Sequence, residues 1–247
     1  PRHNVMVSSE LGAPNTYAPG FSLDDVAAGL YGRRLHFWDW GARRIVQSVD
    51  LGDEGLIPLE VRFHHNPDST HGYVGAALSS TLWHWSKPNG EWKVEKSFGI
   101  PPVEVEGWPF PAPSLITDLL LSLDDRYLYL SNWLHGDIRQ YDISEPAQPR
   151  LVGQVWCGGV LGRGETVRGS ALHGGPQMLQ LSLDGKRLYV TNSLLSSWDN
   201  QFYPDLAQCG SYLLQVDCDT ERGGLRINPD FYVDFGREPA GPARAHE

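Results

Sequence analysis

Histidine is the residue type in this chain whose number and spacing could build a metal site. Nine histidines occur in 247 residues, and two of them, His3 and His65, stand directly before an asparagine at the start of an expected strand. In a radial arrangement of sheets the innermost strands line a central channel, so equivalent imidazoles converge on its axis. Converging imidazoles can coordinate a transition metal. The pattern predicts a histidine-lined metal site.

His135 is set apart from the other histidines by its position in a repeat. It lies in the string NWLHGD at residues 132–137, and sixty residues later Leu195 takes its place. A departure from an internal repeat suggests a local task. A histidine beside Asn or Gly in a turn nevertheless usually bonds backbone groups, and single histidines outnumber metal ligands. Both interpretations stay open for each histidine.

The other histidines and three acids have weaker signals. His36 and His84 alternate with aromatic residues, which predicts one exposed face of a strand, and His64, His71 and His173 are expected at loop or outward positions. Carboxylates at expected strand ends could fix the tautomers of metal-binding imidazoles, and the candidates are Glu10, Glu60 and Asp118. A solvated or turn-bonded acid is the alternative for each.

An internal repeat supplies the elements that must position these side chains. LSLDDRYLYLSNWL at residues 121–134 reappears as LSLDGKRLYVTNSL at residues 181–194. In both copies an apolar run leads into an Asp-Asp or Asp-Gly turn and then into a second alternating run, which is typical of a β-hairpin. Similarity at a fixed period indicates a repeat protein whose units bury their apolar faces against their neighbours.

Weaker echoes extend the repeat to four units. They precede residues 5–7 and 72–75, again about sixty residues apart. We therefore predict an all-β fold made of four-stranded blades, about four blades of a seven-bladed β-propeller. Residues 1–247 would form one partial propeller domain that lacks the N-terminal blades. The one helical signal, at residues 23–30, predicts a short turn in a loop before a strand at residues 34–40.

Composition argues against several classes of function. The formal net charge of −10, with scattered basic residues, argues against a nucleic-acid or anionic-membrane surface. No apolar run is long enough to span a membrane. Cys157, Cys209 and Cys218 form no Cys-x-x-Cys motif and are predicted to be inert fillers. No nucleophile elbow, phosphate loop or dinucleotide fingerprint is present.

Several long strings in this sequence resemble the selenium-binding protein family, whose members include methanethiol oxidases. They are PRHNVM at residues 1–6, DDVAAGLYGRRLHFWD at 24–39, SLDDRYLYLSNWLHGDIRQYDIS at 122–144, GGPQMLQLSLDGKRLY at 174–189 and AHE at 245–247. The resemblance covers nearly the whole chain and corresponds to the C-terminal portion of the family sequence. The family's N-terminal portion, with its cysteine-containing selenium-associated segment and paired histidines, is not part of this chain.

The resemblance implies a seven-bladed propeller that oxidises methanethiol with O2 and water to formaldehyde, hydrogen sulfide and hydrogen peroxide, using copper. It implies four copper ligands in this chain: His3 in PRHNVM, His65 in RFxHNP, His135 in NWLHGD and His246 in AHE. His135 and His246 are the expected catalytic residues. Methanethiol and O2 are the expected small-molecule partners, and selenium association is a further expectation. Because half of the expected site is absent, we expect this chain alone to bind metal poorly and to be inactive.

A non-catalytic propeller is the alternative, acting as a selenium carrier or as a protein-interaction platform in trafficking. An enzyme needs His65, His135 and His246 to point inward around one metal ion. A platform would instead use an exposed face, for which Trp83, Trp85 and Trp92 are candidates, although such residues also pack between blades. We favour the enzyme. A cytoplasmic or a periplasmic location and the oligomeric state stay open.

Overall fold

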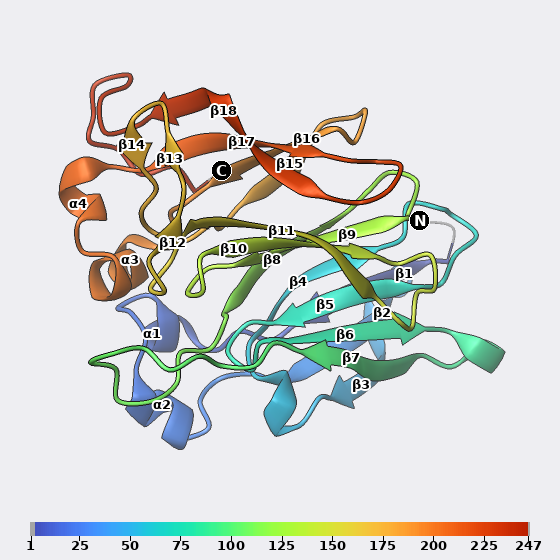
Figure 1. The fold of residues 1–247 in the computed structure, drawn as a ribbon. Helices are drawn as coiled ribbons and strands as arrows, with labels where there is room; N and C mark the ends of the chain where they lie inside the picture. The colour runs from blue at the N-terminus through green and yellow to red at the C-terminus, as the bar shows by residue number, and fades with distance from the viewer. Residues whose placement is uncertain (1–2, 247) are drawn as a thin grey trace.

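β-Strands make up most of the regular structure, as the sequence predicts (Figure 1). The structure is a computed structural model that describes residues 3–246. The first sheet contains β1 (Val5–Ser9), β2 (Arg34–Asp39) and β3 (Arg44–Asp50). The second contains β4 (Pro58–Phe63), β5 (Gly72–Ala76), β6 (Thr81–Ser86) and β7 (Lys93–Gly99). Successive strands within each sheet pair antiparallel.

The third and fourth sheets repeat this plan. The third contains β8 (Ile116–Leu121), β9 (Tyr127–Asn132), β10 (Asp137–Asp142), β11 (Arg150–Gly158) and the two-residue β12 (Arg163–Gly164). The fourth contains β15 (Leu179–Leu181), β16 (Arg187–Thr191), β17 (Tyr212–Cys218) and β18 (Leu225–Asp234). A ribbon of β13 (Thr166–Val167) and β14 (Ser170–Ala171) lies between them in sequence. The four predicted units are thus four successive sheets.

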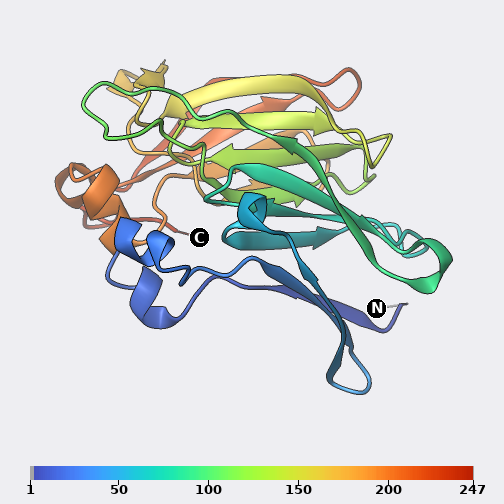
Figure 2. The ribbon, with the colours of Figure 1, turned by 90° about the horizontal axis from the view of Figure 1, so that it is seen from below.

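The sheets pack face to face in chain order, with β4 against β8 and β8 against β15 (Figures 1 and 2). Aromatic and aliphatic side chains fill each interface. Phe37 of the first sheet stacks on Trp92 at a centroid distance of 4.7 Å and meets Trp85 edge-on at 6.2 Å. Trp85 and Trp92 are buried, so they stabilise contacts between sheets and offer no exposed platform.

The first sheet differs from the expected four-stranded unit because it has three strands among the described residues. In the second sheet the His65-Asn66 turn joins β4 to β5, so it follows the first strand of the sheet. The corresponding His3-Asn4 pair precedes β1, which is therefore the counterpart of β5. Our expectation that His3 and His65 lie on innermost strands was wrong for this reason: both lie in turns before a second strand.

The repeated hairpin motif forms the same turn in both copies. Ser122 donates to the Asp124 carboxylate at 2.5 Å, and Ser182 donates to Asp184 at the same distance. Each serine Oγ then accepts the backbone N–H of a residue further along the turn, at 3.1 Å in both copies. These bonds close the tight turns from β8 to β9 and from β15 to β16, which explains why the Ser-Leu-Asp string recurs.

Four short helices gather at one end of the sheets (Figure 1). They are α1 (Pro14–Tyr17), α2 (Leu23–Ala27), α3 (Ser196–Phe202) and α4 (Leu206–Cys209), and the two 3-10 turns are Asp53–Gly55 and Pro88–Gly90. α2 confirms the predicted helical turn, and Ser22 caps it by accepting the Asp25 N–H. We call this the helix end; β4, β8 and β15 begin there. The opposite end, where β4 and β8 lead into their turns, is called the turn end.

Candidate functional site

His135 lies at the helix end, in the tight turn between β9 and β10. Its side chain is buried, and Nε2 donates a hydrogen bond to the Ala112 carbonyl at 3.0 Å. Burial lowers the pKa of His135, so the ring is neutral at pH 7. In a neutral ring whose Nε2 donates, Nδ1 carries the lone pair. His135 is therefore held in one tautomer, and Nδ1 is the atom that could accept a proton or bind a metal.

His246 also lies at the helix end but is exposed. Its Nδ1 is 3.2 Å from the Ser193 carbonyl, so this nitrogen donates, and in the neutral ring Nε2 carries the lone pair. Thr191, the last residue of β16, donates to the His246 carbonyl at 2.9 Å. These bonds attach the C-terminal segment to the end of β16, the strand that α3 follows in the sequence.

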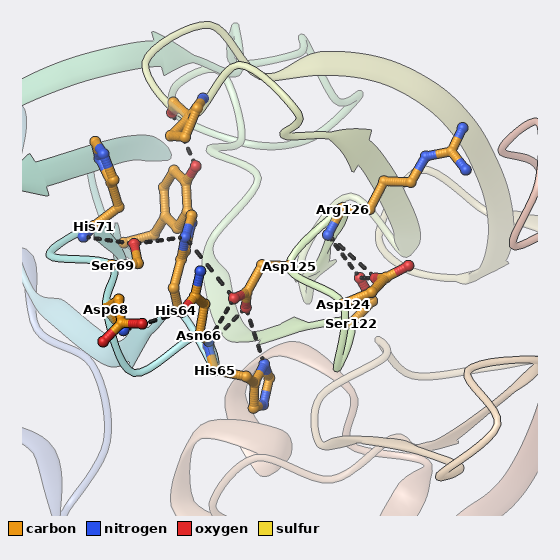
Figure 3. Close-up of polar contacts among 12 residues, drawn as sticks. His64, His65, Asn66, Asp68, Ser69, His71, Ser122, Asp124, Asp125 and Arg126 are labelled. Atoms are coloured by element: carbon orange, nitrogen blue, oxygen red, sulfur yellow. Dashed lines mark hydrogen bonds and ion pairs between the residues drawn. The ribbon is translucent and has the colours of Figure 1, made fainter. Parts of the chain in front are cut away.

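His65 lies at the turn end, where Asp125 of the neighbouring sheet holds it (Figure 3). The Asp125 carboxylate accepts the backbone N–H groups of His65 and Asn66, both at 2.7 Å, and lies 3.1 Å from His65 Nδ1. Nδ1 donates to the carboxylate, so in the neutral form of this partly exposed ring the lone pair is on Nε2. Histidine oriented by a carboxylate in this way is a common metal-ligand arrangement. His3, before β1, is exposed at the same end.

The four predicted ligands thus form two pairs at opposite ends of the sheets. A six-residue strand such as β4 is about 20 Å long, and it separates the turn of His65 from the helix end. Within residues 3–246 no group of three or more His, Cys, Asp or Glu side chains is arranged to hold a metal ion. The structure does not bring His65 together with His135 and His246. These four side chains therefore do not fit one copper site by themselves.

Two of the three carboxylates expected behind the ligands contact an arginine instead. Glu60 pairs with Arg62, and Asp118 lies 4.0 Å from the same guanidinium while accepting the Leu179 N–H at 2.7 Å. Glu10 does contact an imidazole, at 3.0 Å from His36 Nε2. That histidine is not one of the four predicted ligands.

Three further histidines form a cluster at the turn end that the sequence interpretation missed. His71 Nδ1 and His84 Nε2 are only 2.7 Å apart, and the two rings are nearly parallel. His64 lies beside them, with its ring 5.5 Å from that of His71 and its Nδ1 3.0 Å from Ser69 Oγ. Desolvation by burial lowers the pKa of all three, that of His84 to about 4. The predicted exposed position of His84 was wrong, because β6 lies inside its sheet and both faces are covered.

Cys209 differs from the other two cysteines, although the sequence analysis predicted all three to be inert fillers. Cys157 and Cys218 are buried, as expected of fillers, and burial raises the pKa of both thiols. Cys209, at the end of α4, is exposed, and its Sγ lies 3.1 Å from His173 Nε2. Its pKa is raised, first by desolvation, so the thiol is protonated at neutral pH, and His173 Nε2 also lies 3.2 Å from the Gly210 carbonyl.

Comparison with known proteins fixes the family. The sequence profile of the 56kDa selenium binding protein (SBP56) family matches residues 1–247. The chain belongs to this family. A protein from Xenopus tropicalis named methanethiol oxidase is 56% identical over 266 residues, covering 100% of this chain and 56% of the relative. A human protein of the same name is 57% identical with the same coverage. The chain thus spans a little over half the length of these relatives.

Solved structures agree with the fold. A hypothetical selenium-binding protein from Sulfolobus tokodaii superimposes with a TM-score of 0.88 at 43% identity, over 94% of this chain and 53% of that structure. The solved structures that the chain resembles are β-propellers. The all-β stack of successive sheets is therefore a part of a propeller-type fold. Within the described residues, no helix is both long enough and apolar enough to cross a bilayer.

Proposed function

We propose that this chain is part of a methanethiol oxidase. The observation that carries the proposal is the identity of 55–58% between the whole chain and several relatives that bear this name. The alignment behind this identity covers the whole chain and so includes every sheet and both ends of the fold. The reaction would convert methanethiol, O2 and water into formaldehyde, hydrogen sulfide and hydrogen peroxide. The four sheets would be four blades of a seven-bladed ring, the first of them one strand short.

Copper enters this proposal through the resemblance to the family. In their neutral forms His65 and His246 each offer a lone pair on an exposed ring, and His135 carries one on a buried ring. Because the four histidines lie at two ends, a complete ligand set at either end needs donors from elsewhere in the longer protein. This chain's own residues fix the imidazole tautomers and place His135 in a water-poor position.

The test joins the chain to the N-terminal portion of its Xenopus tropicalis relative. Bound copper and methanethiol-dependent peroxide release would be measured for the joined protein, for the 247-residue chain and for variants of the joined protein. We expect the joined protein to be active and the chain alone to be inactive. His135→Ala should abolish both signals, whereas His173→Ala, a histidine at the same end, should abolish neither. An active His135→Ala variant would remove this residue from the reaction centre.

The second candidate is a non-catalytic selenium carrier or interaction scaffold. The family description, which names selenium binding, favours it. A joined protein that binds no copper and releases no peroxide, but retains selenium after incubation with selenite, would favour the carrier over the enzyme.

A further inference from the structure

A cleft at the helix end is lined by aromatic rings and belongs to none of the sites above. It has a volume of about 750 Å3 and is lined by residues 21–24 at the start of α2, residues 107–110 before β8, residues 159–160 after β11 and residues 201–203 at the end of α3. These segments are far apart in the sequence but lie close together at the helix end of the sheets (Figure 1). The volume falls in the range of small-molecule sites.

Hydrogen bonds hold the walls of the cleft in place. The Gln201 side chain of α3 accepts the Phe21 N–H at 2.7 Å and donates to the Phe21 carbonyl at 3.1 Å. Trp198, also on α3, donates from Nε1 to the Tyr17 carbonyl at 2.8 Å. Tyr203 donates to the Trp133 carbonyl at 2.6 Å. A cleft whose walls are bonded in this way loses little conformational freedom when a ligand enters it.

Four half-buried rings form a connected aromatic lining. Phe202 lies 6.2 Å from Phe21 and 5.8 Å from Trp108, and Trp108 lies 6.3 Å from Phe110. None of the four is in the fully buried core, so their surfaces are available to a ligand. The negative face of an aromatic ring attracts a cation, and tryptophan does so most strongly.

One charged side chain lines the cleft. Asp24, at the start of α2, is the one charged residue among the described residues that line it. Behind the lining, Asp199 of α3 is paired with Arg244 at 3.5 Å, and Arg163 follows the lining residues Gly159 and Val160 in the sequence. An anion would meet no positive partner here, and a neutral ligand would cover the carboxylate without compensating its charge. A primary ammonium is strongly hydrated, whereas a methylated cation sheds water more easily.

We propose that this cleft binds a methylated onium cation, either a quaternary ammonium or a sulfonium. Its methyl groups pack against Phe21, Trp108 and Phe202, and its charge is balanced by Asp24. The carboxylate and the rings together favour a cation over a neutral molecule of the same shape.

Calorimetric titration of the 247-residue chain tests this with three small probes. Choline supplies a quaternary ammonium, (2-hydroxyethyl)dimethylsulfonium supplies a sulfonium, and 3,3-dimethylbutan-1-ol is the neutral molecule with the shape of choline. We expect saturable binding of at least one cation, roughly tenfold tighter than that of the neutral alcohol. Binding of only one of the two cations supports the proposal and shows whether the ligand is an ammonium or a sulfonium.

Paired variants locate the site. Trp108→Leu and Asp24→Asn should each weaken cation binding by roughly fivefold to tenfold. Trp40→Leu and Asp230→Asn remove the same chemical groups outside the cleft and should leave binding unchanged. Equal affinity for the neutral alcohol, absence of saturable binding, or full affinity in both cleft variants would overturn the proposal. Circular dichroism of each variant shows that it is folded.

Discussion

The buried His71–His84 pair makes the stability of this protein depend on pH in a calculable way. His84 is 5% exposed, and its pKa falls from the ordinary 6.5 to about 4, chiefly through desolvation and then through the neighbouring His71 and His64. The groups facing it that act in the opposite direction are weaker, with Glu95 on β7 the one that raises its pKa. The folded state therefore keeps this imidazole neutral where the unfolded chain protonates it.

The sign and size of the change in the free energy of unfolding follow from proton linkage. Above pH 6.5 His84 is neutral in both states, and its full contribution to stability is present. As the pH falls from 6.5 to about 4, the unfolded chain binds a proton that the folded chain does not, so the free energy of unfolding falls. A pKa lowered from 6.5 to about 4 corresponds to a loss of roughly 3 kcal/mol in total, of which roughly 2 kcal/mol is lost by pH 5.

Urea denaturation at pH 7 and pH 5 measures this effect when wild type is compared with His84→Leu. Other titrating groups act on both proteins, so the difference between them isolates His84. We expect the wild type to lose roughly 2 kcal/mol more than the variant between these two pH values. Leu82→Met, on the same buried strand, changes packing without removing a proton site and should follow the wild type. If the difference between wild type and His84→Leu stays constant to within about 0.5 kcal/mol, the reasoning is wrong.

Three further changes test the contacts that hold the two ends of the sheets. Asp125→Ala removes the acceptor of the His65 turn and should lower the free energy of unfolding by about 1–3 kcal/mol in urea, with Asp125→Asn losing less. Tyr203→Phe leaves the Trp133 carbonyl without its 2.6 Å donor and should cost about 1–2 kcal/mol, seen as a lower Tm. Gly136→Ala should be the most damaging, because this glycine has φ +86° and a Cβ would lie 2.2 Å from the Gly158 carbonyl oxygen; loss of soluble protein or of cooperative unfolding checks it.

The fold could be predicted because its signals are local. The Ser-Leu-Asp turn and the alternating runs beside it encode one hairpin, and its repetition at residues 121–134 and 181–194 encodes a stack of sheets. The number of strands in the first sheet could not be predicted in the same way. The His-Asn pair marks a turn before the second strand, and nothing in the motif says which strand of the sheet follows it.

The candidate site was less predictable because it depends on which end of a strand each residue occupies. His65 and His135 belong to equivalent units, yet one follows the first strand and the other follows the second, so they lie at opposite ends. The burial of His84 could not be predicted from the sequence either. His84 alternates with tryptophans as an exposed residue would, but β5 and β7 flank its strand and the adjacent sheets cover it. Contacts between sheets, such as Asp125 with His65, carry no sequence pattern.

The contrast between the two ends bears on where a reaction centre would form. The turn end presents His65 on a partly exposed ring and His3 in solvent, so water reaches both. The helix end holds His135 buried and in one tautomer, and the Tyr203 hydroxyl bonds the Trp133 carbonyl of the same turn, whereas His246 at this end is exposed. Exclusion of water strengthens electrostatic interactions and protects reactive intermediates from side reactions. Of the four predicted ligands, His135 is therefore the one whose surroundings best exclude water, and His65 with Asp125 also joins neighbouring sheets.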